Sequence, residues 1–235
     1  MRLLVLTAAR SERDSFLRSF PDREVTHLGP YETLTLETRA GDVVAVAGGV
    51  GPASAAAATA TVLALGGDFD VALNVGIAGA FRGLGSEVGG VVVASSIVFA
   101  DLGAWAPDGF MDLTEMGWGT ILAAPPAQWV DHADSAISAA GLPSVVGEIL
   151  TLSTMTGTDA RAEELAVRHG APAEAMEGAG MSQAAVTFGV PVMEVRTISN
   201  LVGERDRESW QLGPAMDLLA EVGAALLGEP WPALQ

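Results

Sequence analysis

Apolar and polar positions follow two alternating patterns along most of the chain, one typical of strands and one typical of helices. Runs of apolar and β-branched residues predict buried strands over residues 3–6, 43–47, 70–75, 87–99, 145–152 and 192–200. Helices are predicted to begin near Ser11 and at Pro52, and to cover residues 159–168, 177–188 and 214–227. This alternation predicts one α/β domain over residues 1–235 with a central, largely parallel sheet.

Two parts of the chain depart from this alternation. Residues 21–39 alternate more loosely and predict short antiparallel strands. Residues 100–126 are irregular and carry Trp105, Phe110 and Trp118 among Gly, Pro and Asp. A long irregular segment is typical of a functional lid or pocket wall, although its aromatic side chains can also simply pack the loop onto the body.

The predicted strand over residues 192–200 ends on two polar side chains, Ser199 and Asn200. Ligands of open α/β sheets bind outside the carboxyl ends of the strands, so Asn200 is placed to meet a small molecule. An amide offers donors and an acceptor in one plane, which suits a purine edge. The alternative role for Asn200 is to cap or turn the chain before Gly203.

Two carboxylates stand where a strand gives way to a helix. With Ser11 as N-cap and Asp14 three residues later, Glu12 lies in the first helical turn. There it either complements the helix dipole or serves as a general base at the rim of a site. Glu177 precedes an alanine-rich helix and is either a dipole partner or an acceptor for the hydroxyls of a sugar.

Glycines follow two of the predicted strands. Gly76 and Gly79 come after the strand over residues 70–75, where they either let the backbone approach a ligand closely or only form a turn. Gly49 and Gly51 match part of a dinucleotide-binding fingerprint, but its third glycine is replaced by Ser54. This second group therefore indicates a tight turn whose amides can face a hydroxyl or an anion.

Composition excludes several classes of function. The formal net charge of −17 argues against nucleic acid or an anionic membrane as a partner. The chain has no cysteine and three histidines without close pairing, so we expect no disulfide, no metal site and no cofactor. No apolar stretch is long enough to span a bilayer, and the N-terminus lacks the pattern of a signal peptide. We expect a cytoplasmic enzyme.

Four short motifs resemble those of the purine nucleoside phosphorylase and nucleosidase superfamily, and they occur in the same order and at similar spacing. They are AARSE at residues 8–12, NVGIAG at 74–79, AME at 175–177 and RTISN at 196–200. Within it the chain is most similar to the futalosine hydrolase family, through residues 100–104, 109–110, 117–119, 154–157 and 199–200. The resemblance implies a three-layer α/β/α domain with a mixed, largely parallel sheet, and a homo-oligomer, dimer or larger.

The resemblance also implies roles for individual residues. Glu12 matches the glutamate that activates the hydrolytic water, and Met176 with Glu177 matches the pair that holds the ribose. Asn200 stands where related nucleosidases carry an aspartate that acts on N7 of adenine. Because an asparagine can donate to N7 or to a 6-oxo group, we expect a 6-oxopurine nucleoside as substrate. The implied reaction is hydrolysis of futalosine to hypoxanthine and dehypoxanthine futalosine, in menaquinone biosynthesis.

Five further residues are expected to contact the substrate: Ile77, Gly79, Thr154, Met155 and Ser199. Related nucleosidases have a serine in place of Ile77, whose apolar side chain cannot hydrogen-bond an anion. This replacement favours water over phosphate as the attacking group, with Arg10 and Arg82 left as possible phosphate ligands.

Three alternatives remain open. A phosphate-dependent purine nucleoside phosphorylase is the nearest, and a nucleosidase for methylthioadenosine or S-adenosylhomocysteine is disfavoured by Asn200. A non-catalytic nucleoside-binding protein is disfavoured because it has no use for Glu12 as a base.

Futalosine carries a benzoate on its 5′ side, for which Arg82, Arg205 and Arg207 are candidate partners. For Arg205 and Arg207, surface ion pairs with their acidic neighbours are the favoured role.

Overall fold

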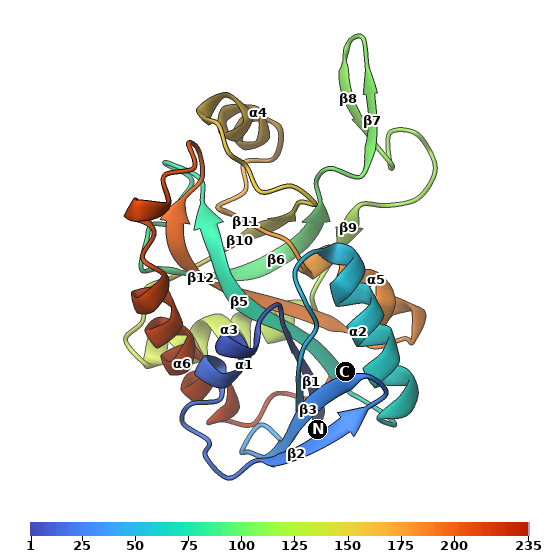
Figure 1. Cartoon of the computed structure of the whole chain (residues 1–235), viewed down its shortest axis with the longest axis vertical. Coiled ribbons are helices and arrows are strands. Elements are labelled where there is room, and N and C mark those ends of the chain that lie inside the picture. The colour runs from blue at the N-terminus through green and yellow to red at the C-terminus, as the bar shows by residue number, and fades with distance from the viewer. Residues whose placement is uncertain (235) are drawn as a thin grey trace.

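The computed structural model describes residues 1–234 and is built on a ten-stranded mixed sheet (Figure 1). The strands run in the order β11-β10-β6-β12-β5-β1-β4-β3-β2, and β9 pairs with β6. Because β11 also pairs with β5, the strands β5, β12, β6, β10 and β11 form a closed ring at one end of the sheet. The strands of the sheet are β1 (Arg2–Thr7), β2 (Glu24–Leu28), β3 (Tyr31–Glu37), β4 (Asp42–Ala47), β5 (Val71–Ala80), β6 (Val91–Phe99), β9 (Leu122–Ala123), β10 (Ser144–Thr151), β11 (Ala173–Ala175) and β12 (Val192–Leu201).

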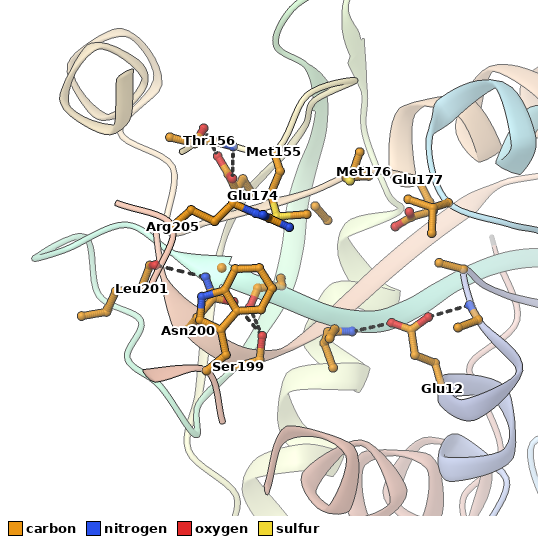
Figure 2. A pocket seen from close by; sticks show the side chains of 18 of the residues that line it. Glu12, Met155, Thr156, Glu174, Met176, Glu177, Ser199, Asn200, Leu201 and Arg205 are labelled. Atoms are coloured by element: carbon orange, nitrogen blue, oxygen red, sulfur yellow. Dashed lines mark hydrogen bonds between the residues drawn. The ribbon is translucent and has the colours of Figure 1, made fainter. Parts of the chain in front are cut away.

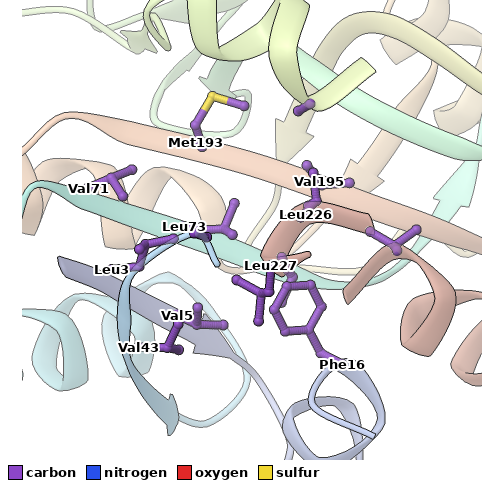
Figure 3. Packing of buried hydrophobic residues seen from close by; sticks show 14 of the residues in the cluster. Leu3, Val5, Phe16, Val43, Val71, Leu73, Met193, Val195, Leu226 and Leu227 are labelled. Atoms are coloured by element: carbon purple, nitrogen blue, oxygen red, sulfur yellow. The ribbon is translucent and has the colours of Figure 1, made fainter. Parts of the chain in front are cut away.

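Helices cover both faces of this sheet (Figure 1). Leu3 and Val5 of β1 pack in one cluster with α1, α3 and α6 (Figure 3). Leu4 and Leu6 point to the other face and pack with α2 and α5. Successive side chains of a strand point to opposite faces, so a strand buried on both sides is apolar throughout. The helices are α1 (Arg10–Phe16), α2 (Pro52–Leu65), α3 (Ala127–Ala139), α4 (Asp159–His169), α5 (Gly178–Thr187) and α6 (Leu212–Leu227), with a short 3₁₀ turn, η1 (Arg207–Ser209).

The three-layer α/β/α architecture and the mixed sheet are therefore confirmed. Parallel pairing joins β1 to β4 and β5, β12 to β5, and β10 to β6 and β11. Antiparallel pairing builds the β2–β3–β4 edge, and β2 and β3 are the short antiparallel strands predicted over residues 21–39. None of the helices within residues 1–234 is long and apolar enough to cross a membrane.

Two predicted boundaries are wrong in ways that matter for the site. β5 does not end at residue 75 but continues to Ala80, so Gly76 and Gly79 lie inside a strand that pairs with β12. Helix α1 begins at Arg10 with Ala9 as N-cap, so Ser11 is not the cap and Glu12 occupies the third helical position. The Glu12 carboxylate accepts the Ala9 N–H at 2.8 Å, which fixes the start of the helix.

The region between β6 and β10 is more ordered than the sequence predicts. Residues 100–126 contain a two-stranded hairpin, β7 (Gly103–Ala106) and β8 (Gly109–Asp112), which projects from the body (Figure 1). Helix α3, which the sequence analysis did not anticipate, then buries Trp129, Ala133 and Ile137 against the sheet. These three residues recur at intervals of four, which is the spacing of one helix face.

Candidate active site

A cavity of about 260 Å³ lies where β5, β11 and β12 meet the start of α1 (Figure 2). All but one of the predicted site residues line it: Glu12, Ile77, Gly79, Met155, Met176, Glu177, Ser199 and Asn200. Thr154 is not among the lining residues, and its second neighbour Thr156 takes part instead. Figure 2 shows Glu12 and Glu177 toward one end of the cavity and Ser199, Asn200 and Glu174 toward the other.

Glu12 is buried and held by two backbone donors. One carboxylate oxygen accepts the Ala9 N–H, and the other accepts the Ile77 N–H at 3.0 Å. Burial raises the pKa of the Glu12 carboxyl, and the Arg196 guanidinium and the two N–H donors only partly offset this. A carboxylate with a raised pKa, fixed at the wall of a cavity, is suited to take a proton from water.

Glu177 belongs to a buried charge network centred on Arg196. Its Oε2 lies 3.1 Å from Arg196 Nη2, and its Oε1 accepts the Gly51 N–H at 3.2 Å. Arg196 Nε also donates to Glu194 Oε1 at 2.8 Å. The Gly51 contact uses the glycine-rich turn before α2, which the sequence indicated only as a turn that can face a ligand.

Arg196 is fully buried and was not recognised from the sequence as part of the site. Burial alone would lower the pKa of its guanidinium, but Glu194, Glu177 and Glu12 outweigh that effect and raise it. Glu194, equally buried, has a raised pKa because burial outweighs its contact with Arg196. Arg196 therefore supplies the positive charge that this group of carboxylates shares.

The far end of the cavity presents amide and hydroxyl groups. Asn200 Nδ2 donates to the Leu201 carbonyl at 3.0 Å, and Asn200 Oδ1 accepts from Ser199 Oγ at 2.8 Å. One Nδ2 hydrogen remains for a ligand, because the NH₂ group has two. Asn200 does not cap a turn before Gly203, since it lies within β12, paired with Gly79 of β5.

Two residues at this end were missed by sequence reasoning, Glu174 and Thr156. Glu174 is buried on β11 and accepts hydrogen bonds from the Thr156 N–H at 3.0 Å and from Thr156 Oγ1 at 2.6 Å. Burial raises the pKa of the Glu174 carboxyl, and the two Thr156 donors act in the opposite direction. The available signal was a second glutamate three residues before Glu177, on the short strand that precedes α5.

The three candidate arginines for a substrate carboxylate occupy different places. Arg205 lines the cavity with Trp210, and its guanidinium carbon lies 5.9 Å from the centre of that ring. Arg82 lines a separate cavity, and Arg207 lines neither of the two. The ion pairs found within residues 1–234 do not include Arg205 or Arg207, so the surface pairing favoured for them is wrong.

Comparison with known proteins assigns the chain to a family. The model of the phosphorylase superfamily matches residues 2–228. A futalosine hydrolase of Streptomyces coelicolor is 45% identical over 228 residues, which cover 94% of this chain and 93% of the relative. The chain belongs to the futalosine hydrolase family of this superfamily.

Further relatives agree with this placement. A futalosine hydrolase of Thermus thermophilus is 35% identical over 77% of this chain and 79% of its own length. The solved structure of futalosine hydrolase from Helicobacter pylori superposes with a TM-score of 0.83 at 22% identity, covering 96% of this chain and 97% of that chain. A 5′-methylthioadenosine/S-adenosylhomocysteine nucleosidase of Colwellia psychrerythraea, solved with adenine, has a TM-score of 0.81 at 23% identity, covering 99% and 98%. The two structures establish the shared fold.

The site of this futalosine hydrolase family member carries carboxylates at both ends. Glu12, Glu174, Glu177 and Glu204 line the cavity, together with Arg205. Within residues 1–234, no group of three or more His, Cys, Asp or Glu side chains is arranged to hold a metal ion. The arrangement offers a base, a hydroxyl acceptor and an amide donor, which together suit proton transfer to and from a polar ligand.

Proposed function

We propose that the protein hydrolyses the N-glycosidic bond of futalosine, releasing hypoxanthine and dehypoxanthine futalosine, as a step of menaquinone biosynthesis. The observation that carries the proposal is the meeting of Glu12, Glu177 and Asn200 in one cavity, with Glu177 held by a buried arginine. The names of the relatives from Streptomyces coelicolor and Thermus thermophilus support futalosine as the substrate.

In this proposal, Glu12 is the general base. Ionised Glu12 takes a proton from a water molecule as that water attacks the anomeric carbon of the ribose. The bond between the anomeric carbon and the purine nitrogen breaks, its electron pair leaves with the purine, and positive charge develops on the sugar, as in other glycoside hydrolyses. The purine anion takes up a proton from solvent to give hypoxanthine, and Glu12 returns its proton to solvent. The nearby carboxylates Glu12 and Glu177 stabilise that charge, and the backbone donors at Ala9 and Ile77 hold Glu12 in position.

Glu177 binds the ribose hydroxyls. Each of its oxygens is already oriented by one donor, Arg196 Nη2 on one side and the Gly51 N–H on the other. An ionised carboxylate has about four acceptor positions, so two remain for the hydroxyls of the ribose. Met176, which also lines the cavity, supplies apolar surface at this end.

Asn200 binds the leaving base. Its free Nδ2 hydrogen donates to N7 or to the 6-oxo group and so stabilises negative charge that builds on the purine as the bond breaks. Ser199 fixes the amide by donating to Asn200 Oδ1. This donor arrangement suits a 6-oxopurine better than a 6-aminopurine, whose amino group needs an acceptor at the same edge.

Water is favoured over phosphate as the attacking group. Arg10 lies 3.4 Å from Glu32 in an ion pair, and neither Arg10 nor Arg82 lines the cavity. The carboxylates of the lining repel an anion, and Ile77 offers it no side-chain hydrogen bond. Of the candidate arginines for the benzoate of futalosine, Arg205 is the one that lines this cavity, near Asn200 and Glu174 (Figure 2).

The test is base release followed by chromatography. The purified protein is given futalosine, inosine, methylthioadenosine and aminodeoxyfutalosine, each with and without phosphate. We expect hypoxanthine from futalosine at a rate that phosphate does not change. Release that requires phosphate would assign the chain to phosphorolysis, release of adenine would contradict the role of Asn200, and no release from any nucleoside would favour a binding protein.

Three further properties remain predictions of the sequence. We propose that residues 1–235 form one domain, that the protein works in the cytoplasm, and that it assembles as a homo-oligomer, dimer or larger. Sedimentation of the purified chain measures the last of these directly.

A further inference from the structure

Glu174 is a buried carboxylate that the proposed reaction does not use. It is 7% exposed, lines the cavity, and belongs to none of the ion pairs within residues 1–234. Both of its oxygens accept a hydrogen bond from Thr156, which orients the group. Since an ionised carboxylate has about four acceptor positions, it can still accept hydrogen bonds from a ligand.

The strand register places Glu174 opposite Asn200. Gly79 of β5 is the register partner of Asn200 on β12 and also of Glu174 on β11, so the three residues form one row across three strands. A Cβ atom added at Gly79 would lie 2.9 Å from Val202 Cγ2, 3.2 Å from Asn200 Nδ2 and 3.8 Å from Glu174 Cγ. The missing side chain therefore lets the amide, the carboxylate and the Val202 methyl group converge over this strand, with the backbones of Asn200 and Glu174 about 10 Å apart.

The chemistry of the two side chains matches one edge of a 6-oxopurine. That edge presents an N1–H donor beside the O6 acceptor, whereas a 6-aminopurine presents an acceptor at N1. We propose that Glu174 accepts a hydrogen bond from N1–H of the purine while Asn200 donates to O6 or N7, so that the pair selects 6-oxopurines. This inference rests on the proposed function, because it takes the base to lie between these two residues.

Thr156 is a positioning residue in this arrangement. Its two donors favour the ionised form of Glu174 against the effect of burial, and only the ionised form lacks a hydrogen to offer to N1 of a 6-aminopurine. With a 6-aminopurine, the Glu174 carboxylate and the purine N1 would both be acceptors, and the buried carboxylate would be left without its hydrogen bond. An unpaired buried polar group is the usual basis of strong discrimination between analogues. The contact forms with the base in the ground state, so its loss changes KM and base binding more than kcat.

The experiment measures equilibrium binding of free bases by calorimetry to the full chain. The bases are hypoxanthine, adenine and 1-methylhypoxanthine, which keeps O6 and N7 but has no N1–H. The proteins are the wild type, Glu174→Gln, Glu174→Ala and the control Glu208→Gln, which removes the same charge from an exposed residue outside the cavity lining. Thermal unfolding of each variant shows whether it is folded.

We expect the wild type and Glu208→Gln to prefer hypoxanthine over adenine, and Glu174→Gln to reduce that preference by about 10- to 100-fold, the usual range for a hydrogen bond to a charged group. Methylation of N1 should weaken binding to the wild type by a similar factor. Glu174→Ala leaves room for the methyl group, so this variant should bind hypoxanthine and 1-methylhypoxanthine about equally.

Two results would overturn the inference. One is a Glu174→Gln variant that binds hypoxanthine and adenine more weakly by the same factor, as expected if Glu174 only supports the fold. The other is a wild type that binds 1-methylhypoxanthine as well as hypoxanthine, a comparison that needs no variant to fold. Failure of the proposed function is seen separately, because futalosine would then stay intact while the preference among free bases is still measured.

Discussion

Replacing Glu12 with Gln tests the proposed base directly, because the side chain keeps its shape and loses its ability to take a proton. The Glu12 oxygens accept the N–H groups of Ala9 and Ile77 at 2.8 and 3.0 Å. A glutamine has one oxygen, so one of these N–H groups would face an NH₂ group. An unpaired N–H of this kind costs about 1–3 kcal/mol.

The same substitution removes a buried negative charge, which offsets part of that cost. Burial raises the pKa of Glu12, and Glu177 raises it further, so the folded protein bears an energetic cost for the ionised carboxylate that the amide avoids. We therefore expect a net loss of about 0–2 kcal/mol in the free energy of unfolding. For a chain of this length, that corresponds to a fall of about 0–8 °C in Tm.

The effect on catalysis is expected to be much larger. Loss of a general base lowers the rate by about 10²- to 10⁴-fold. The assay is hypoxanthine release from saturating futalosine, with Asp14→Asn as the matched control, because Asp14 lies in the same helix with an exposed side chain, and its buried partner Arg13 keeps a second ion pair with Glu32. We expect the control to keep kcat within about twofold, the scale of a surface substitution.

The dependence on pH gives a second measurement of the same group. Glu12 must be ionised to act, so kcat of the wild type should fall as the pH drops through its raised pKa, and Glu12→Gln should lack this limb. The stability of the folded protein depends on pH in the opposite direction. A carboxyl with a raised folded pKa contributes stability below its unfolded pKa and loses it as the pH rises through the folded value.

The wild type should therefore lose stability relative to Glu12→Gln as the pH rises through that window. A folded Glu12→Gln variant that keeps more than a tenth of the wild-type kcat would refute the assignment of Glu12 as the base. So would an acid limb that is identical in the wild type and the variant.

Four other substitutions probe the charge network, the packing of α6 and the base preference. Arg196→Met should cost about 3–5 kcal/mol in urea unfolding, because its partner carboxylates stay buried without a counter-charge, and a cost below about 1 kcal/mol would contradict this. In α6, a methyl group at Gly223 would overlap a backbone carbonyl of α1, so Gly223→Ala should lower the free energy of unfolding by about 1–3 kcal/mol. A methyl group at Gly213, in the same helix, would meet no atom within 4 Å, so Gly213→Ala should leave the free energy of unfolding unchanged or raise it by up to about 1 kcal/mol. Asn200→Asp should raise the ratio of adenine release to hypoxanthine release, and an unchanged ratio would show that this side chain does not choose the base.

The fold was predictable because its strands and helices have simple periodic patterns. Strands such as β1 are buried on both faces and are apolar through their centre, residues 3–6 in β1, and the helices after Pro52 and over residues 159–168 carry clear end signals. Helix α3 was missed although its buried residues have helical spacing, because it follows an irregular segment without a capping side chain. The site residues Glu12, Glu177 and Asn200 were found because they stand at or just beyond the ends of predicted strands, within motifs that resemble those of the superfamily.

The charged interior of the site was not predicted. Glu194 and Arg196 alternate with apolar residues along β12, a pattern that usually means one face in solvent. Both are buried instead, because each supplies the other with an opposite charge at 2.8 Å, and Arg196 also reaches Glu177 on another element. Opposite charges two residues apart on one strand were the signal, but their burial depends on a partner that is close only in the folded chain.

Close approach at two glycines of β5 explains why short motifs describe this site incompletely. A Cβ atom at Gly76 would lie 2.6 Å from Glu12 Oε1 and 2.7 Å from Arg196 Nη1, so the base and the buried cation converge where β5 has no side chain. Gly79 does the same for Asn200 and Glu174 at the other end of the cavity. The glycines in the NVGIAG motif thus serve neither as a turn nor as a phosphate loop. Without a Cβ atom at these two positions, polar side chains from α1, β11 and β12 can meet directly over β5. The pairing of β5 with β11 and β12 shows which side chains of those two strands take part.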